Sequence, residues 1–282
     1  MNSSSDLSLP TGFRGIVANV GVKDSTDDLV IVATDGPVAA SGVFTQSRFV
    51  GPSVLVSREH ITNLRASAVV VISKNANVAN GKQGEGDARE VTALTARHVG
   101  CEPGDVLIAS TGVIGRSYPM DTIRAGFADI SDQPWSAQLS DIARGIMTTD
   151  TVEKTSSVMI AGSPAVVSGV AKGVGMIEPD MATMIAIILT DADISAEVLQ
   201  STFSRVADST FNCVSIDGDT STSDTAIIMS SGSIADVSHD AFESALMQVC
   251  TDLTRQIAAD GEGAETLIEV LVDEARNEAQ AR

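Results

Sequence analysis

Apolar residues along the chain follow two recurring patterns. Short runs rich in Val, Ile, Leu and Ala, bounded by turn residues, alternate with longer segments in which apolar residues recur every three or four positions. The first pattern is typical of buried strands and the second of amphipathic helices. Their alternation predicts a mixed α/β fold.

The short apolar runs predict the strands. The expected strands are 29–33, 54–57, 68–73, 105–109, 211–216, 225–230 and 266–272, and a hairpin pairs 157–160 with 164–170. The run 185–189 is continuously apolar and rich in β-branched residues, as expected of a central strand that is buried on both faces. The helical pattern predicts helices at 86–100, 120–130, 137–147, 195–207 and 239–259.

Composition narrows the classes of function. The chain has 282 residues, of which 43% are hydrophobic and only 3% aromatic, so its core must consist of aliphatic side chains. A net charge of −19 argues against nucleic acid as a partner, because phosphates require basic patches. We expect no signal peptide and no transmembrane segment. Cys101, Cys213 and Cys250 lack metal-ligand spacing, so we expect reduced thiols in a cytoplasmic protein.

No metal or phosphate motif is complete. The acidic run 217–224 lacks the glycine and the glutamate of a calcium-binding loop, and the stretch 81–84 lacks the ending of a phosphate-binding loop. Because both motifs are incomplete, we expect neither a cofactor nor a metal. The alternating asparagines of 75–77 predict instead a tight loop held by side-chain hydrogen bonds.

The segment before the central strand carries the candidate chemistry. Thr183 lies where the turn Glu178-Pro179-Asp180 leads into the strand, and Lys172 precedes it between glycine-rich residues. Spacing alone favours a plain interpretation, a strand threonine and a solvated lysine. A threonine becomes a good nucleophile when it is the first residue of a chain, because its α-amine, of pKa about 7.7–8.0, is then the adjacent base. That state requires cleavage after Ala182.

The run KGVGMIEPDMATM, residues 172–184, resembles the self-cleaving signature of the ornithine acetyltransferase family, the bifunctional glutamate N-acetyltransferases. The resemblance covers residues 11–281. It implies cleavage between Ala182 and Thr183 into an α subunit, 1–182, and a β subunit, 183–282, assembled as an α2β2 heterotetramer. It also implies that Thr183 carries the acetyl group, and that the fold is a layered α-β-β-α-like sandwich.

The resemblance assigns further residues to the site. The pair Thr111-Gly112 follows the strand 105–109 and would pass for a plain turn by itself. The resemblance implies an oxyanion hole, made by the Thr111 hydroxyl and the Gly112 N–H. It implies that Lys172 and Glu262 contact the substrate, as does one threonine of the run 147–151. Thr148 is favoured for this role, and Thr149 remains open.

The implied reaction moves an acetyl group from N-acetylornithine to glutamate, in arginine biosynthesis. Two alternatives remain: an amidase or aminopeptidase-like hydrolase that uses the same nucleophile, and an inactive truncated remnant. The second arises because family members continue past Arg282 with a Pro-Asn-Trp-Gly-Arg motif and a tail that completes the pocket. On this basis we expect the chain to cleave itself better than it transfers acetyl groups. Two positions resemble members from clavulanic-acid-type clusters more than arginine-pathway enzymes. They are Val174 and Lys74, and arginine-pathway enzymes usually have glycine at the position of Lys74.

Overall fold

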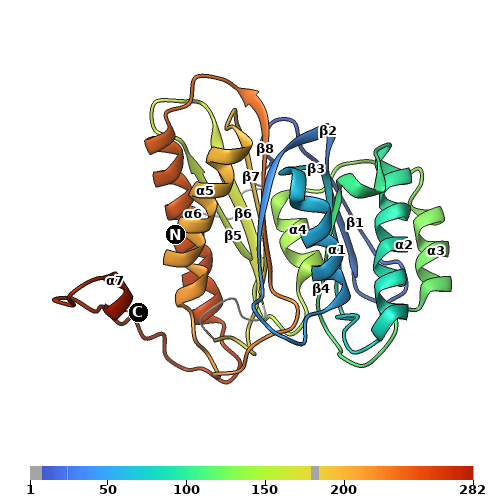
Figure 1. Cartoon of the computed structure of the whole chain (residues 1–282). Coiled ribbons are helices and arrows are strands. Elements are labelled where there is room, and N and C mark those ends of the chain that lie inside the picture. The colour runs from blue at the N-terminus through green and yellow to red at the C-terminus, as the bar shows by residue number, and fades with distance from the viewer. Residues whose placement is uncertain (1–7, 24, 179–183, 282) are drawn as a thin grey trace.

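The computed structural model describes residues 8–23, 25–178 and 184–281. These residues form one continuous sheet with helices packed on it (Figure 1). The strand order is β4-β3-β2-β8-β7-β6-β5, and β1 pairs with β2 off this path. The pairs β3–β4 and β7–β8 are parallel, and the other pairs are antiparallel. The predicted mixed α/β fold is therefore confirmed.

The strands are named here by their bounds. They are β1 Arg14–Ala18, β2 Leu29–Phe44, β3 Arg65–Ile72, β4 Val106–Ser110, β5 Lys154–Met159, β6 Val166–Lys172, β7 Ile185–Ala192 and β8 Thr225–Ile234. Strand β2 joins two halves of the sheet: its first part pairs with β1 and β3, and its last part pairs with β8. The pairing register of β2 with β3 shifts between Ala33 and Val38, where the strand passes from one half to the other. The two expected β layers are thus parts of one hydrogen-bonded sheet.

The helices cover both outer faces and the space between the halves. They are α1 Pro52–His60, α2 Gly81–Val99, α3 Met120–Asp129, α4 Leu139–Ile146, α5 Ala196–Ser209, α6 His239–Ala259 and α7 Glu278–Ala281. Figure 1 shows α5 and α6 on one side of the molecule, α2 and α3 on the other, and α4 between the two halves. Three hydrophobic clusters, in which aliphatic side chains predominate, fill the corresponding spaces. No helix within the described ranges combines the length and the apolar character that crossing a membrane requires.

Strand β7 confirms the prediction for the central apolar run. All eight of its residues are buried, and it lies between β6 and β8. One face of β7 joins the cluster under α5 and α6, while Ile185, Ile187 and Leu189 join the cluster around α4. Because both faces are covered, the strand has no need of polar alternation.

Three predicted strands are wrong. Residues 54–57 lie in α1, which begins at Pro52, a residue favoured in the first turn of a helix because it needs no N–H partner there. Residues 211–216 form a short 3₁₀ turn, Phe211–Cys213, followed by irregular chain. In runs of only four to six residues, periodicity alone cannot distinguish a strand from a helix or a turn.

The third wrong prediction concerns 266–272, which has no regular secondary structure. Its apolar side chains are exposed; Ile268 is 76% exposed and Leu271 is 87% exposed. Figure 1 shows the chain after α6 extending away from the sheet. A β-prone sequence forms a strand only where a partner strand supplies hydrogen bonds, and none in the described part of the chain does so here.

Candidate active site

The candidate site lies at an edge of the sheet where several segments end. Strands β3 and β4 are parallel, so the loops that follow them leave the sheet at the same edge. These loops, the end of β6 and the segment after α4 enclose a cavity of about 570 Å³. It is lined by Val22, Lys23, Lys74, Asn75, Thr111, Gly112, Val113, Arg116, Thr148, Thr149, Lys172, Val174, Gly175, Met176, Asp217 and Glu262. Every predicted site residue within the described ranges is among them.

The Thr111-Gly112 pair directly follows β4. The Thr111 side chain is buried, and its Oγ1 accepts a hydrogen bond of 3.2 Å from the Lys172 Nζ, which leaves the hydroxyl proton free for another acceptor. Gly112 has a φ of +131°, and a Cβ there would lie 2.1 Å from the carbonyl carbon of Lys74. Only glycine fits this close approach of two loops. The loops therefore present a hydroxyl and a backbone turn to the cavity side by side.

The loop after β3 is held from within, as its asparagines predict. Asn75 Oδ1 accepts a 2.8 Å hydrogen bond from the Asn77 N–H, and Asn75 Nδ2 donates to the Ser117 carbonyl at 3.2 Å. Lys74 adopts a positive φ of 76° at the start of this loop. The loop thus has a fixed shape against Gly112.

Lys172 ends β6 and is almost fully buried. It lies opposite Ile185 in the β6–β7 pairing, so it is close to the start of the central strand. Burial lowers the pKa of Lys172, and the carboxylate of Asp150 opposes this effect. The ammonium contacts Thr111, so the lysine predicted to bind substrate and the threonine predicted for the oxyanion hole are direct neighbours.

Asp150 is the polar centre beneath the cavity. Its Oδ1 accepts hydrogen bonds from the Gly173 N–H at 2.7 Å and from Lys154 Nζ at 2.8 Å, and its Oδ2 accepts one from the Thr148 N–H at 3.0 Å. Burial opposes ionisation of this carboxyl, but the charge of Lys172 and these hydrogen bonds outweigh it and lower its pKa. Asp150 therefore positions the backbone beside both Thr148 and Lys172.

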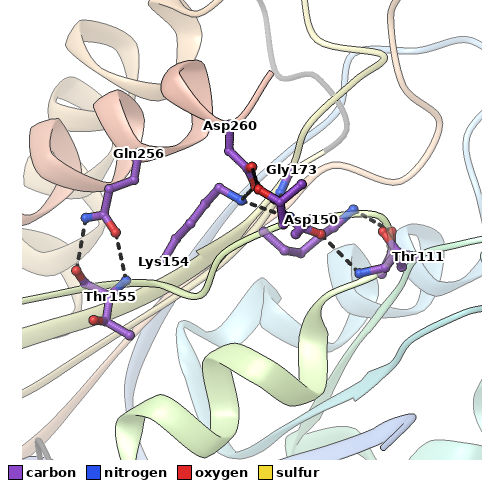
Figure 2. A network of polar contacts seen from close by, with 10 residues as sticks. Thr111, Asp150, Lys154, Thr155, Gly173, Gln256 and Asp260 are labelled. Atoms are coloured by element: carbon purple, nitrogen blue, oxygen red, sulfur yellow. Dashed lines mark hydrogen bonds and ion pairs between the residues drawn. The ribbon is translucent and has the colours of Figure 1, made fainter. Parts of the chain in front are cut away.

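Lys154 extends this network to α6. Its Nζ also lies 2.5 Å from Asp260 Oδ2, and the side chains of Lys154 and Asp150 are 0% exposed while that of Asp260 is 5% exposed. Figure 2 shows Lys154 reaching towards both carboxylates, and Gln256 bonding the backbone of Thr155 close by. The buried ion triad Asp150–Lys154–Asp260 thus ties segments that come from opposite sides of residue 183.

Two carboxylates lie at another part of the cavity. A Cβ on Gly175 would lie 3.3 Å from both Asp217 Oδ2 and Glu262 Oε2, so both side chains flank this glycine. The Glu262 N–H donates to the Val174 carbonyl at 2.6 Å, which fixes its backbone beside the segment that follows β6. The cavity therefore has anionic groups here and the ammonium groups of Lys74 and Lys172 elsewhere.

Thr148 and Thr149 both line the cavity. Thr148 is half-buried, with its backbone held by Asp150, whereas Thr149 is exposed. This difference favours Thr148 as the better-positioned hydroxyl. The substrate-binding role of either threonine stays a prediction.

Ala182 and Thr183, the predicted cleavage site and nucleophile, lie outside the described residues. Met184, the next residue, is buried and donates its N–H to Asp224 Oδ1 at 3.0 Å. Burial raises the pKa of Asp224 to about 7, although the Met184 N–H and nearby hydroxyls offset part of the effect. Within the described ranges, Asp224 Oδ2 is buried without a hydrogen-bond partner.

Sequence reasoning missed the supporting residues. Asp150 lies in the threonine-rich run 147–151, Asp224 ends the acidic run 217–224, and Lys154 and Asp260 belong to no pattern that indicated a supporting role. Their one signal is the presence of charged residues at the ends of strongly apolar strands and helices. Such a position is usually solvated, so that signal is weak without coordinates. No set of three or more His, Cys, Asp or Glu side chains in the described residues could hold a metal ion.

The α/β fold brings a Thr-Gly pair, a buried lysine and two carboxylates around one cavity, an arrangement that offers groups of both charges to a small ligand. Residues 14–282 match the model of the ArgJ family, and the chain belongs to that family. This membership confirms the family predicted from the residues around Thr183, and with it the enzyme class, the glutamate N-acetyltransferases.

Curated relatives match almost all of the chain. It is 50% identical to "Arginine biosynthesis bifunctional protein ArgJ 2" from Nostoc sp., over 98% of this chain and 70% of that protein. It is 47% identical to "Glutamate N-acetyltransferase Oat2" from Streptomyces clavuligerus, over 99% of this chain and 71% of that protein.

Two solved structures of the family are also similar. An ArgJ protein from Bacillus halodurans shares 32% identity with a TM-score of 0.55, over 61% of this chain and 92% of that chain. The ornithine acetyltransferase of Mycobacterium tuberculosis, solved with ornithine, shares 29% identity with a TM-score of 0.54, over 63% of this chain and 96% of that chain. A Burkholderia β-aminopeptidase, 12% identical with a TM-score of 0.53, shares the fold alone.

Proposed function

We propose that this protein transfers an acetyl group from N-acetylornithine to glutamate through an acetyl ester on Thr183, after cleaving itself between Ala182 and Thr183. The observation that carries the proposal is the charge distribution of the cavity. Lys172 and the Thr111 hydroxyl are in direct contact, and Asp217 and Glu262 flank Gly175. A zwitterionic amino acid presents a carboxylate to the first group and an ammonium to the second.

Self-cleavage begins with attack of the Thr183 Oγ on the carbonyl carbon of Ala182. The peptide C–N bond breaks, the nitrogen takes up the hydroxyl proton, and an ester links Ala182 to Thr183 Oγ. This nitrogen is now the free α-amine of Thr183, and water then hydrolyses the ester to release the Ala182 carboxylate and the Thr183 hydroxyl. The Thr111 hydroxyl and the Gly112 N–H are the donors that would stabilise the oxyanion of each tetrahedral intermediate.

Acetyl transfer follows as a double displacement. The freed amine of Thr183 accepts the hydroxyl proton while Oγ attacks the acetyl carbonyl of N-acetylornithine. The proton passes to the leaving amine, ornithine departs, and the acetyl group remains as an ester. The amine of glutamate then attacks this ester, and Thr183 Oγ regains a proton. Lys172 would bind the α-carboxylate of either substrate, and Glu262 the side-chain ammonium of N-acetylornithine.

The length of the solved relatives supports cleavage. Because 61–63% of this chain matches 92–96% of theirs, each of those chains is about two thirds as long as this one. They are also much shorter than the curated relatives, which are longer than this chain. Separation at Ala182–Thr183 would give an α subunit of similar length. From membership of the family, we also propose that the two subunits assemble as an α2β2 heterotetramer and that the enzyme acts in arginine biosynthesis.

The first experiment tests cleavage. Intact mass spectrometry and N-terminal sequencing of purified protein should reveal a new N-terminus at Thr183. The Thr183→Ala variant should remain a single full-length chain, and Thr183→Ser should still cleave because it keeps the hydroxyl. Wild-type protein that stays uncleaved would rule out the free-amine mechanism.

The second experiment tests the oxyanion hole. Thr111→Ala should lower kcat by roughly 10²–10³-fold, the cost of losing one oxyanion donor in comparable enzymes, with little change in KM. Thr111→Ser retains the hydroxyl and should recover most of the activity. A Thr111→Ala variant with wild-type kcat would remove this hydroxyl from the mechanism.

The third measurement separates transfer from hydrolysis. Cleaved protein is incubated with N-acetylornithine, with and without glutamate, and steady-state ornithine release is followed. A transferase needs glutamate for turnover beyond the first acetylation. Steady release without glutamate would identify a hydrolase that uses the same nucleophile.

A further inference from the structure

The cavity holds more positive charge than one α-carboxylate requires. Lys23, Lys74, Arg116 and Lys172 line it and outnumber the carboxylates of Asp217 and Glu262, although the protein as a whole carries a net charge of −19. Lys74 and Lys172 both line this cavity, so their ammonium groups share one site. Like charges held together in a half-buried site favour a ligand that brings two negative charges.

Lys74 is placed for such a ligand. Its Nζ donates one hydrogen bond to the Met147 carbonyl, which brings the ammonium beside Thr148. An ammonium has three N–H donors, so others remain for a ligand. The residue is half-buried and adopts a positive φ of 76°, a conformation that favours glycine and costs free energy for any other residue. The loop therefore carries a lysine where glycine would relieve backbone strain.

We propose that Lys74 binds the distal carboxylate of the acetyl acceptor and makes the site selective for amino acids with two carboxylates. This inference rests on the proposed function, whose mechanism names no residue that binds the side-chain carboxylate of glutamate. Lys172 takes the α-carboxylate, and Lys74 takes the second carboxylate of glutamate. N-acetylornithine ends in an ammonium instead, so it gains nothing from Lys74 and directs its side chain to Glu262 and Asp217.

The test compares two acceptors and two half-reactions. Lys74→Met removes the charge at similar length, and Lys74→Gly removes the side chain while relieving the positive φ, so it should fold at least as well. Both variants should raise KM for glutamate about 10- to 100-fold, the loss expected for a charge-assisted hydrogen bond. KM for glutamine, which has the same shape without the distal charge, should stay close to its wild-type value. Lys74→Arg should restore the preference for glutamate.

Donor kinetics supply the internal control. The burst of ornithine released from N-acetylornithine without acceptor should keep its concentration dependence in Lys74→Met. Lys82→Met, which removes an exposed lysine from α2, should leave both half-reactions unchanged. Equal effects of Lys74→Met on glutamate and glutamine would show that Lys74 only supports the loop and would overturn the assignment. A wild-type protein that releases no ornithine would instead defeat the proposed function itself.

Discussion

Two buried aspartates near the start of the central strand have opposite surroundings. Asp150 contacts Lys154 directly and accepts backbone N–H bonds on both oxygens. Asp224 accepts one such bond, from Met184, and its other oxygen has no partner in the part of the chain that the structure describes. The pKa of Asp150 is lowered and that of Asp224 is raised to about 7.

Burial is common to both residues, so it cannot explain the difference. Desolvation raises the pKa of any buried carboxyl, and the sign of the net shift depends on whether a cation and N–H donors compensate it. At Asp150 the compensation ties together the segments that carry Thr148, Lys172 and, through Asp260, Glu262. Asp224 is compensated only in part, and it accepts a hydrogen bond from Met184, the residue that follows the predicted nucleophile in the sequence. The first region is built for rigidity, and the second contains a group that can change protonation near neutral pH.

The largest effect on the free energy of unfolding should come from removing Lys154, the cation that pairs with Asp150. Lys154→Met fills a similar volume but leaves Asp150 and Asp260 buried without their shared partner. Breaking a buried ion pair in this way costs roughly 3–5 kcal/mol of unfolding free energy. Urea unfolding should be measured in the Thr183→Ala background, which keeps one chain and a unimolecular transition if the wild type cleaves.

Two further variants make this prediction specific. Glu153→Gln changes an exposed neighbour that pairs with Arg144 at the surface, and it should have little effect. Adding Asp260→Asn to Lys154→Met removes one of the two stranded charges and should recover part of the loss. A loss below about 1 kcal/mol for Lys154→Met would mean that the triad is solvated and that the contrast with Asp224 is not one of compensation.

The next effect is a pH dependence that comes from Asp224. Its pKa is about 7 in the folded protein, against an ordinary value of 3.8. Between these values the folded state binds the proton and the unfolded state does not, so stability falls as the pH rises. The slope should approach about 1.4 kcal/mol per pH unit within that window. Asp224→Asn keeps an acceptor for the Met184 N–H without a charge and should remove this part of the slope.

The pH dependence of stability has opposite signs for Asp150 and Asp224. The lowered pKa of Asp150 stabilises the fold above its ordinary value of 3.8, and this stabilisation is lost only as the pH falls below that value. If Asp224→Asn and the wild type had parallel pH profiles, Asp224 would have to be ionised throughout.

Sequence patterns predicted many of the helices and strands and the motif residues of the cavity, but not the buried charged groups that this comparison concerns. The apolar periodicity of 239–259 matches α6 residue for residue, and the continuous run 185–189 lies within the fully buried β7. The motif residues Thr111, Gly112, Lys172 and Glu262 do line one cavity. Local patterns succeed here because the period of a long amphipathic helix shows directly in the sequence, and because a continuous run of β-branched residues is typical of a strand buried on both faces.

The rest depends on contacts between distant segments. Lys154 meets Asp260 across 106 positions of sequence, and no local pattern reports such a pairing. The strand expected at 266–272 fails for the same reason, because its formation depends on a partner and not on its own β propensity. Lys74 was visible as an unusual residue, but its contact with the Met147 carbonyl and its place in the same cavity as Lys172 required the fold.

The smallest effect should come from an ion pair that has good geometry but no burial. Arg89 holds both carboxylate oxygens of Glu59, at 3.2 and 2.7 Å, and also bonds Glu85, yet its side chain is 41% exposed. Water and salt already stabilise these charges in the unfolded chain, so Arg89→Met should change the unfolding free energy too little to resolve. Any residual change should vanish at about 1 M salt, where the screening length is only about 3 Å. The loss from Lys154→Met should persist under the same conditions, because ions cannot enter its buried site. If both variants lost stability equally and both losses disappeared in salt, then burial would not be what distinguishes the network beneath the cavity from the pairs on the outer helices.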